Sequence, residues 1–374
     1  MKFKRFFLFT LIATLAILLT ACGSAPASSW PGMVASADGA NVYLASSSYV
    51  YNVQVKDGTE VTISTPDSTT PVPARFPIKS DGAKAFYAPP AISSDGQVLV
   101  GSAATSDHTF YSYDPLTTNT KWMSPTNSSP WLAGALVVKD AVYAPGGDGN
   151  LYAYSLAGVQ RWVSPISKHS LWSTPVADSA GKQIYLVTID HQVIAINPLD
   201  GKPIWSVTLD NSIIGSPAVA GNMLVVGTLS GKLYALDQAT GSQKWVNPLI
   251  GEIWGTPGYD GSNVYIGTVV DKTGKFYAVN ASNGQTVWSK DDEGSITAGP
   301  LVTNDQIIYG TELGKIQSVD KTGTPKWQAT IENAHMYTPP LLAGNMVIVA
   351  PMNATFLLAA YDLNGAQKWT FIAK

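Results

Sequence analysis

Short runs of apolar residues recur along the chain, separated by turns rich in Gly, Asn, Asp and Ser. Residues 216–249 illustrate one group of runs, which reads "SPAVA", "MLVVGTL", "KLYALD" and "QKWVNPL". Apolar runs of this length, bounded by turn residues, are typical of β-strands, and no long helical period is visible after residue 30. The pattern therefore predicts four short antiparallel strands per group.

Each group of runs closes on a Trp, and the groups repeat at intervals of 39 to 43 residues. Most groups open with a small residue followed by Pro, as at Pro217 and Pro257, and Ala135 takes this place once. An eighth, degraded unit at 41–62 has Thr62 where the Trp is expected. A period in this range indicates a repeat architecture. The repeated tryptophans are Trp122, Trp162, Trp205, Trp245, Trp288, Trp327 and Trp369.

The second and third runs of each unit are apolar on both faces, so each sheet must be covered on both sides. A closed ring achieves this, because every sheet packs between two neighbours. We therefore expect an all-β fold, an eight-bladed β-propeller of four-stranded antiparallel blades, over residues 30–374. We expect Asp237 and the following Gly241 to lock a turn, as do their equivalents, and each repeated Trp to pack between adjacent blades. These positions are thus predicted to be structural.

The N-terminus carries an export signal. Lys2, Lys4 and Arg5 precede a 14-residue apolar stretch, which is too short to span a bilayer. It ends in Leu-Thr-Ala-Cys22, which resembles a bacterial lipobox and predicts a signal peptide at 1–21, a lipidated Cys22 and a flexible leash at 22–29. The alternative is an ordinary secreted protein with a cysteine near its cleavage site. Cys22 is the only cysteine, so no intramolecular disulfide is expected.

The charge and the motif content narrow the function. Only 13% of residues are charged and the net charge is −3, so a nucleic-acid partner is not expected. The four histidines are dispersed without metal-ligand or nucleophile motifs, and no catalytic residue, metal or cofactor is predicted. We expect Asp148 to be a hairpin-turn residue and the acidic run Asp291–Glu293 to be a solvated loop.

Aromatic residues recur just before the innermost strand of several units, where ring closure would gather them around one mouth of the propeller. Such residues could stack a sugar, a quinone or a peptide side chain, or they could plug the channel and pack under loops. The candidate binding mouth comprises Tyr87, Trp131, His169, Trp172, Trp254, His335 and Tyr337. An insertion near 62–89, rich in Pro, is predicted on the same face as an irregular excursion, either mobile or functional.

The order of Pro-x-Val, an apolar strand, Gly-x-Leu-Tyr-Ala-Leu-Asp, Thr-Gly and Trp, best seen at 216–245, resembles the repeat of pyrroloquinoline-quinone-type propellers. It does not resemble WD40 repeats, which end a unit in Trp-Asp. With the lipobox and eight units, the chain resembles the BamB family of outer-membrane assembly lipoproteins. That resemblance implies a monomeric, non-enzymatic scaffold, lipid-anchored at the periplasmic face of the outer membrane, that binds a barrel-assembly subunit.

Two other functions stay open. The first is a periplasmic or cell-surface propeller that binds a ligand such as a carbohydrate or a cofactor; a cell-surface location applies if the organism has a single membrane. The second, and the least favoured, is a quinone-dependent dehydrogenase. Quinone enzymes of this fold are longer and carry an adjacent cysteine pair, which this sequence lacks.

Overall fold

The computed structural model describes residues 31–373 except 66–67, 81 and 126. The predicted signal peptide, Cys22 and the leash at 22–29 therefore lie outside the described residues. Within the described part of the chain, no helix has the length and hydropathy needed to cross a membrane.

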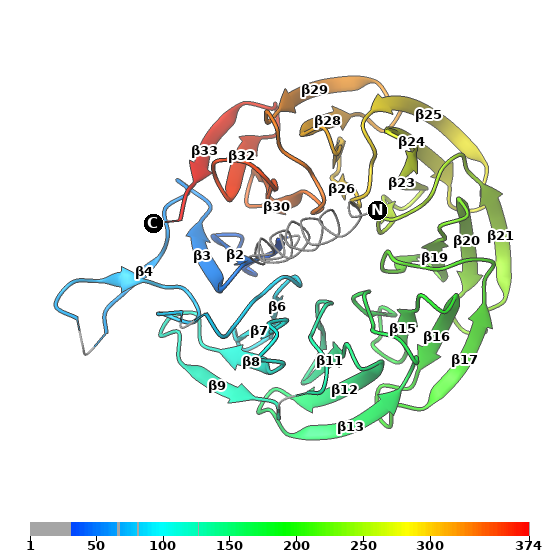
Figure 1. Ribbon diagram of the computed structural model, residues 1–374. Helices are drawn as coiled ribbons and strands as arrows, with labels where there is room; N and C mark the ends of the chain where they lie inside the picture. The colour runs from blue at the N-terminus through cyan, green and yellow to red at the C-terminus, as the bar shows by residue number, and fades with distance from the viewer. Residues whose placement is uncertain (1–30, 66–67, 81, 126, 374) are drawn as a thin grey trace, which may run out of the picture.

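Eight antiparallel sheets stand side by side around a central axis, in the order of the sequence (Figure 1). Seven of them have four strands, and the first to fourth strands of each follow one another from the axis to the rim. The first sheet has three strands, β1-β2-β3. The prediction of an eight-bladed, all-β propeller is confirmed. The missing fourth strand of the first blade is the one departure from four strands per blade.

The strands of the first four blades, with the short hairpin β4-β5 that follows the first, are as follows: β1 Gly32–Ala35, β2 Asn41–Ser46, β3 Tyr49–Gln54, β4 Thr62–Ile63, β5 Val72–Pro73; β6 Ala91–Ile92, β7 Val98–Gly101, β8 Phe110–Tyr113, β9 Thr120–Met123; β10 Leu136–Val138, β11 Ala141–Pro145, β12 Asn150–Ser155, β13 Gln160–Pro165; β14 Val176–Ala177, β15 Ile184–Val187, β16 Gln192–Ile196, β17 Pro203–Thr208.

The strands of the last four blades are these: β18 Ala218–Ala220, β19 Met223–Gly227, β20 Lys232–Asp237, β21 Gln243–Pro248; β22 Gly258–Tyr259, β23 Asn263–Val270, β24 Thr273–Asn280, β25 Thr286–Glu293; β26 Leu301–Val302, β27 Ile307–Gly310, β28 Lys315–Val319, β29 Pro325–Thr330; β30 Leu341–Ala343, β31 Met346–Val349, β32 Leu358–Asp362, β33 Gln367–Phe371.

The core is divided among the boundaries between blades. In the fifth blade, Leu224 and Val226 pack against the fourth blade, whereas Val225 and Leu233 pack against the sixth. Successive side chains of a strand point to opposite faces, so one apolar run serves two boundaries. Each such side chain, fully buried, contributes about 1.5 to 3 kcal/mol. The two-sided apolar pattern of the sequence is thus what closes the ring.

At seven of the boundaries, the repeated Trp of one blade contacts the next blade. Its Nε1 donates a hydrogen bond of 2.8–3.0 Å to a carbonyl of that blade in the turn after the third strand. The indole ring also lies on the turn glycine, and a Cβ on Gly241 would be 2.6 Å from the ring of Trp205. Gly241 has a φ of +72°, so glycine is required there for both reasons. The pairs are Trp122 with Leu156, Trp162 with Pro198, Trp205 with Gln238, Trp245 with Ala281, Trp288 with Lys321, Trp327 with Leu363, and Trp369 with Val55.

The last of these pairs seals the ring. Trp369 in β33 donates to the carbonyl of Val55, which follows β3, over 2.8 Å. Near the axis, the hydroxyl of Thr338 donates to the carbonyl of Pro31 over 2.5 Å. The last blade therefore packs directly against the first, as Figure 1 shows, and no strand is exchanged between them.

The boundary between the first and second blades is built differently. The fourth position of the first blade is filled by two separate pieces: Val61 donates its N–H to the carbonyl of Asn52 over 2.8 Å, and Phe76 exchanges two backbone hydrogen bonds with Val50. Between these pieces the chain leaves the blade through the hairpin β4-β5, which projects beyond the rim in Figure 1.

The expectation that the Pro-rich insertion is irregular was wrong, because β4 and β5 within it hydrogen-bond to one another. In Figure 1 this hairpin extends beyond the rim of the ring. Its return segment is also anchored. Phe76 is buried and stacks on Tyr113 of the second blade, with ring centroids 4.4 Å apart. Arg75 forms a buried ion pair with Glu60.

Candidate functional site

One face of the ring carries both the loops that lead into the innermost strands and the turns between the second and third strands of the blades. We call it the mouth face. The predicted mouth residues belong to the first kind of loop. Three of them, Tyr87, Trp172 and Trp254, stand three residues before the Pro that precedes an innermost strand. The strand β30 begins after Pro340 rather than Pro339, so Tyr337 occupies the same position.

Trp131 does not belong to this set, and its assignment to the mouth surface was wrong. It stands four residues before Ala135, in the position that Leu171 and Ile253 occupy in other blades, and all three side chains are buried. Trp131 is 1% exposed, lies against Gly101, and donates its Nε1 to the carbonyl of His108 over 2.9 Å. A shift of one residue turns the side chain from the mouth into the core.

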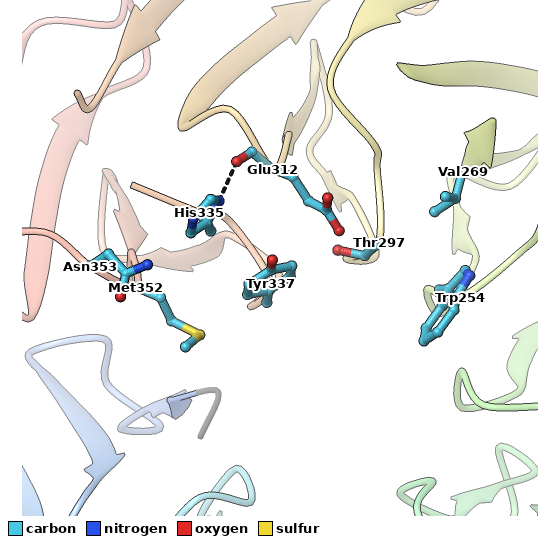
Figure 2. A pocket seen from close by; sticks show the side chains of 8 residues that line it. All are labelled: Trp254, Val269, Thr297, Glu312, His335, Tyr337, Met352 and Asn353. Atoms are coloured by element: carbon cyan, nitrogen blue, oxygen red, sulfur yellow. Dashed lines mark hydrogen bonds between the residues drawn. The ribbon is translucent and has the colours of Figure 1, made fainter. Parts of the chain in front are cut away.

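A cavity of about 450 Å³ opens on the mouth face where the sixth, seventh and eighth blades meet (Figure 2). It brings together Trp254, His335 and Tyr337 of the predicted set. Tyr87, Trp131, His169 and Trp172 do not line it. The lining residues are Trp254, Val269, Thr297, Glu312, His335, Tyr337, Met352 and Asn353. We call this cavity the mouth pocket.

The eighth blade fixes His335 in the wall of the pocket. Its backbone exchanges two hydrogen bonds of 3.0 Å with Met352, and its Nδ1 lies 2.5 Å from the carbonyl oxygen of Glu312. Because a carbonyl only accepts, Nδ1 of His335 carries a proton. The His335 ring stacks on Tyr337, with centroids 5.7 Å apart.

The sixth blade places Trp254 on the opposite wall. Its strands β23, β24 and β25 each have eight residues, and the extra length of β23 lets Val269 exchange two hydrogen bonds of 2.9 Å with Glu252. The carboxylate of Glu252 accepts a hydrogen bond of 2.9 Å from Nε1 of Trp254. The extended blade therefore holds the loop that presents the indole.

The pocket carries one formally charged group. Glu312 is the one carboxylate among the lining residues, and Lys and Arg are absent from them. Burial raises the pKa of Tyr337, and the negative charge of Glu312 raises it further. The hydroxyl oxygen of Thr297 is buried and has no hydrogen-bond partner among the described residues, an arrangement that costs about 1 to 3 kcal/mol.

His169 and Trp172 lie elsewhere on the mouth face. Nδ1 of His169 is 2.6 Å from one carboxylate oxygen of Asp190, and Ser167 donates to the other over 2.6 Å. The bond from Ser167 is the main reason that the pKa of Asp190 is lowered. Because both groups bind Asp190, the histidine does not face the serine as a general base would. Trp172 is 52% exposed.

The acidic run Asp291–Glu293 forms the end of β25, so its assignment to a solvated loop was wrong. The strand alternation points Asp292 inward, where it accepts hydrogen bonds from Tyr309 and Lys290. Asp148 is a turn residue, as expected, and accepts the N–H of Asn150 over 3.2 Å. Among the described residues no cluster of His, Cys, Asp or Glu is placed to hold a metal ion.

Sequence reasoning missed five residues of the pocket. Glu312, Met352 and Asn353 follow second strands, Val269 lies in the extended end of one, and Thr297 stands three residues before Pro300. The last could have been found, because it shares the position of Trp172 and Trp254. The turn residues could have been assigned to the face, since the turn between the second and third strands points the same way as the aromatic loops.

Comparisons with known proteins agree with this architecture. A family model described as outer membrane protein assembly factor BamB matches residues 168–252, 248–334 and 272–373, more than half of the chain. No curated protein matches in a sequence search.

Three solved structures show the same fold at identities below 20%. BamB from Moraxella catarrhalis has a TM-score of 0.65 and 17% identity, over 89% of this chain and 93% of that one. Sqt1 of Saccharomyces cerevisiae has a TM-score of 0.68 and 13% identity, over 91% and 95%. The computationally designed Ika8 protein has a TM-score of 0.61 and 16% identity, over 77% and 86%. The family match and the repeated propeller unit together show that this chain belongs to the BamB family of outer membrane protein assembly factors.

Proposed function

We propose that this protein is a non-catalytic scaffold, anchored by a lipid on Cys22, that binds a protein subunit of the machinery that assembles outer-membrane β-barrels. The match of the BamB family to blades four to eight carries the proposal. The lipobox ending at Cys22 supports attachment outside the cytoplasm, at the periplasmic face of the outer membrane.

The exposed apolar side chains favour the mouth face as the docking surface. Trp172, Ile250 and Leu313 are 52%, 63% and 54% exposed, and they come from loops or turns of three different blades on that face. Aromatic side chains such as that of Trp172 are enriched at protein interfaces. Apolar side chains are also exposed on the outer strands, such as Val163, and on the turns of the opposite face, such as Leu199. Among the described residues, however, the aromatic member of the exposed large hydrophobic side chains is Trp172, which lies on the mouth face.

The test is recovery of partners from native membranes with the tagged full-length protein. Wild type is expected to copurify with a barrel-inserting subunit, and the triple variant Trp172→Ser, Ile250→Ser, Leu313→Ser to recover about tenfold less. The control triple Met123→Ser, Val163→Ser, Leu199→Ser, on other exposed apolar sites, should recover as much as wild type. The Cys22→Ser variant cannot be lipidated at this position, so we expect to recover it in the soluble fraction rather than with the membranes. Absence of any assembly subunit from the wild-type sample would refute the role.

The alternative, a propeller that binds a small ligand, is favoured by the mouth pocket itself. It predicts a thermal shift with a carbohydrate or cofactor and no stable protein partner.

A further inference from the structure

We propose that the mouth pocket binds a guanidinium group, presented as an arginine side chain by a partner polypeptide. The identity of the occupant as a polypeptide rests on the proposed scaffold function. The chemistry of the pocket is argued from its own residues.

The charge of the pocket selects a cation. Glu312 is the single formal charge among the lining residues, and the exposed Glu252, outside the lining set, accepts a hydrogen bond from the indole of Trp254. The described residues that line the pocket include no Lys or Arg to neutralise Glu312. Figure 2 shows the carboxylate of Glu312 directed between Tyr337 and Trp254, away from the backbone carbonyl that binds His335. A cation entering the pocket therefore meets an uncompensated negative charge.

The aromatic walls select the same kind of ligand. Trp254 and Tyr337 lie on two sides of the pocket, and Tyr337 is backed by the stacked ring of His335. A cation over the face of Trp or Tyr is attracted by the ring quadrupole, and a planar guanidinium also stacks on it. The thioether of Met352 adds a polarizable contact on the side of the eighth blade.

The hydrogen-bonding groups distinguish guanidinium from ammonium and from sugars. The lining residues offer acceptors to a ligand, chiefly the carboxylate of Glu312 and the hydroxyl of Thr297. Guanidinium has five N–H donors in a planar fork and no acceptor, so it matches a set of dispersed acceptors. The buried Thr297 oxygen, which has no partner among the described residues, gains a donor in this arrangement.

The first experiment measures binding of a blocked tripeptide, acetyl-Gly-Arg-Gly-amide, to the purified full-length protein by calorimetry. Two matched peptides replace Arg with Lys or with citrulline, the neutral isostere of arginine. Glu312→Gln removes the charge and keeps the backbone carbonyl that holds His335, so the fold should be unchanged. Asp305→Asn, an exposed carboxylate on the opposite face of the same blade, is the control.

We expect the Arg peptide to bind more tightly than the Lys peptide, and the citrulline peptide not to bind. Glu312→Gln should weaken the Arg peptide about tenfold or more, since it removes a charge-assisted contact, and Asp305→Asn should have no effect. Equal binding of the Arg and citrulline peptides, or an unchanged affinity in Glu312→Gln, would overturn the proposal.

The second experiment repeats the recovery of partners from membranes with Glu312→Gln. If Glu312→Gln recovers less partner while Asp305→Asn recovers as much as wild type, the result supports an arginine supplied by the partner. Full recovery by Glu312→Gln, together with loss in the apolar triple variant, refutes the partner's arginine and leaves the scaffold function standing. If wild type recovers no assembly subunit, the scaffold function fails, and the peptide measurements still decide the chemistry of the pocket.

Discussion

Seven of the blade boundaries use one device, and the boundary between the first and second blades uses another. At the seven, a Trp donates to the next blade and lies on a turn glycine. At the eighth, the Trp is absent and the corresponding turn residue of the second blade is Thr118, with a φ of +57°. Thr118 is possible there because no indole lies on it. The Trp and the turn glycine are thus both absent from the same boundary.

The replacement at that boundary comes from the Pro-rich insertion. Phe76 enters a cluster with Tyr43, Phe86, Tyr111 and Tyr113, so aromatic rings fill the space between the blades. The two kinds of boundary show that what each boundary requires is an apolar ring that fills the space between the blades, whichever residue provides it. A boundary can lose its Trp if another segment supplies an apolar ring in its place.

The largest effect is expected for Phe76→Ala. Removing this buried ring leaves a cavity between the first and second blades and should lower the free energy of unfolding by about 3 to 5 kcal/mol. Urea denaturation of the purified protein measures it, with the neighbouring, exposed Ile78→Ala as the control. A loss of less than about 1 kcal/mol would mean that the insertion does not replace the Trp.

A smaller effect is expected for Trp245→Phe at an ordinary boundary. The ring stays largely in place, but the carbonyl of Ala281 loses its 2.8 Å hydrogen bond in a buried position. The free energy of unfolding should fall by about 1 to 3 kcal/mol. The same substitution at Trp254, whose Nε1 bonds a carboxylate at the surface, should change the midpoint little. Equal losses for the two variants would contradict the role assigned to the repeated indole nitrogen.

The smallest effect is expected for Thr118→Gly. Glycine relieves the left-handed backbone of a β-branched residue, worth about 1 to 2 kcal/mol, but gains entropy in the unfolded chain and loses the side-chain contacts of Thr. The net change in the urea midpoint should correspond to less than about 1 kcal/mol. A large destabilisation would show that Thr118 has a packing role equivalent to that of the Trp-glycine pair.

The sequence predicts the repeated part of the molecule and not the exceptions. Each blade has the same packing problem, so seven Trp positions and the turns at Asp237 and its equivalents could be read from their spacing. Trp131 was misplaced because a one-residue shift reverses its direction, and spacing alone did not distinguish its loop. The pairing of Phe76 with Val50 is long-range, and it depends on an insertion that no other blade has.

The residues of the mouth pocket could be predicted only in part. Trp254, His335 and Tyr337 were identified because aromatic residues recur in their loops. Glu312, which supplies the charge, comes from the turn Thr311–Gly314, whose sequence resembles that of Thr228–Gly231 in the fifth blade. Its significance depends on which neighbouring loops happen to be aromatic, and only the arrangement of three blades reveals that.

The contact of Trp369 with Val55 has a consequence for folding. Until β33 packs against β3, the first and seventh blades each present a bare apolar side to the surroundings, because the eighth blade between them is incomplete. Folding must therefore keep both open flanks apart from other chains until β33 has joined the ring. The ring closes only when segments 314 residues apart in the sequence meet.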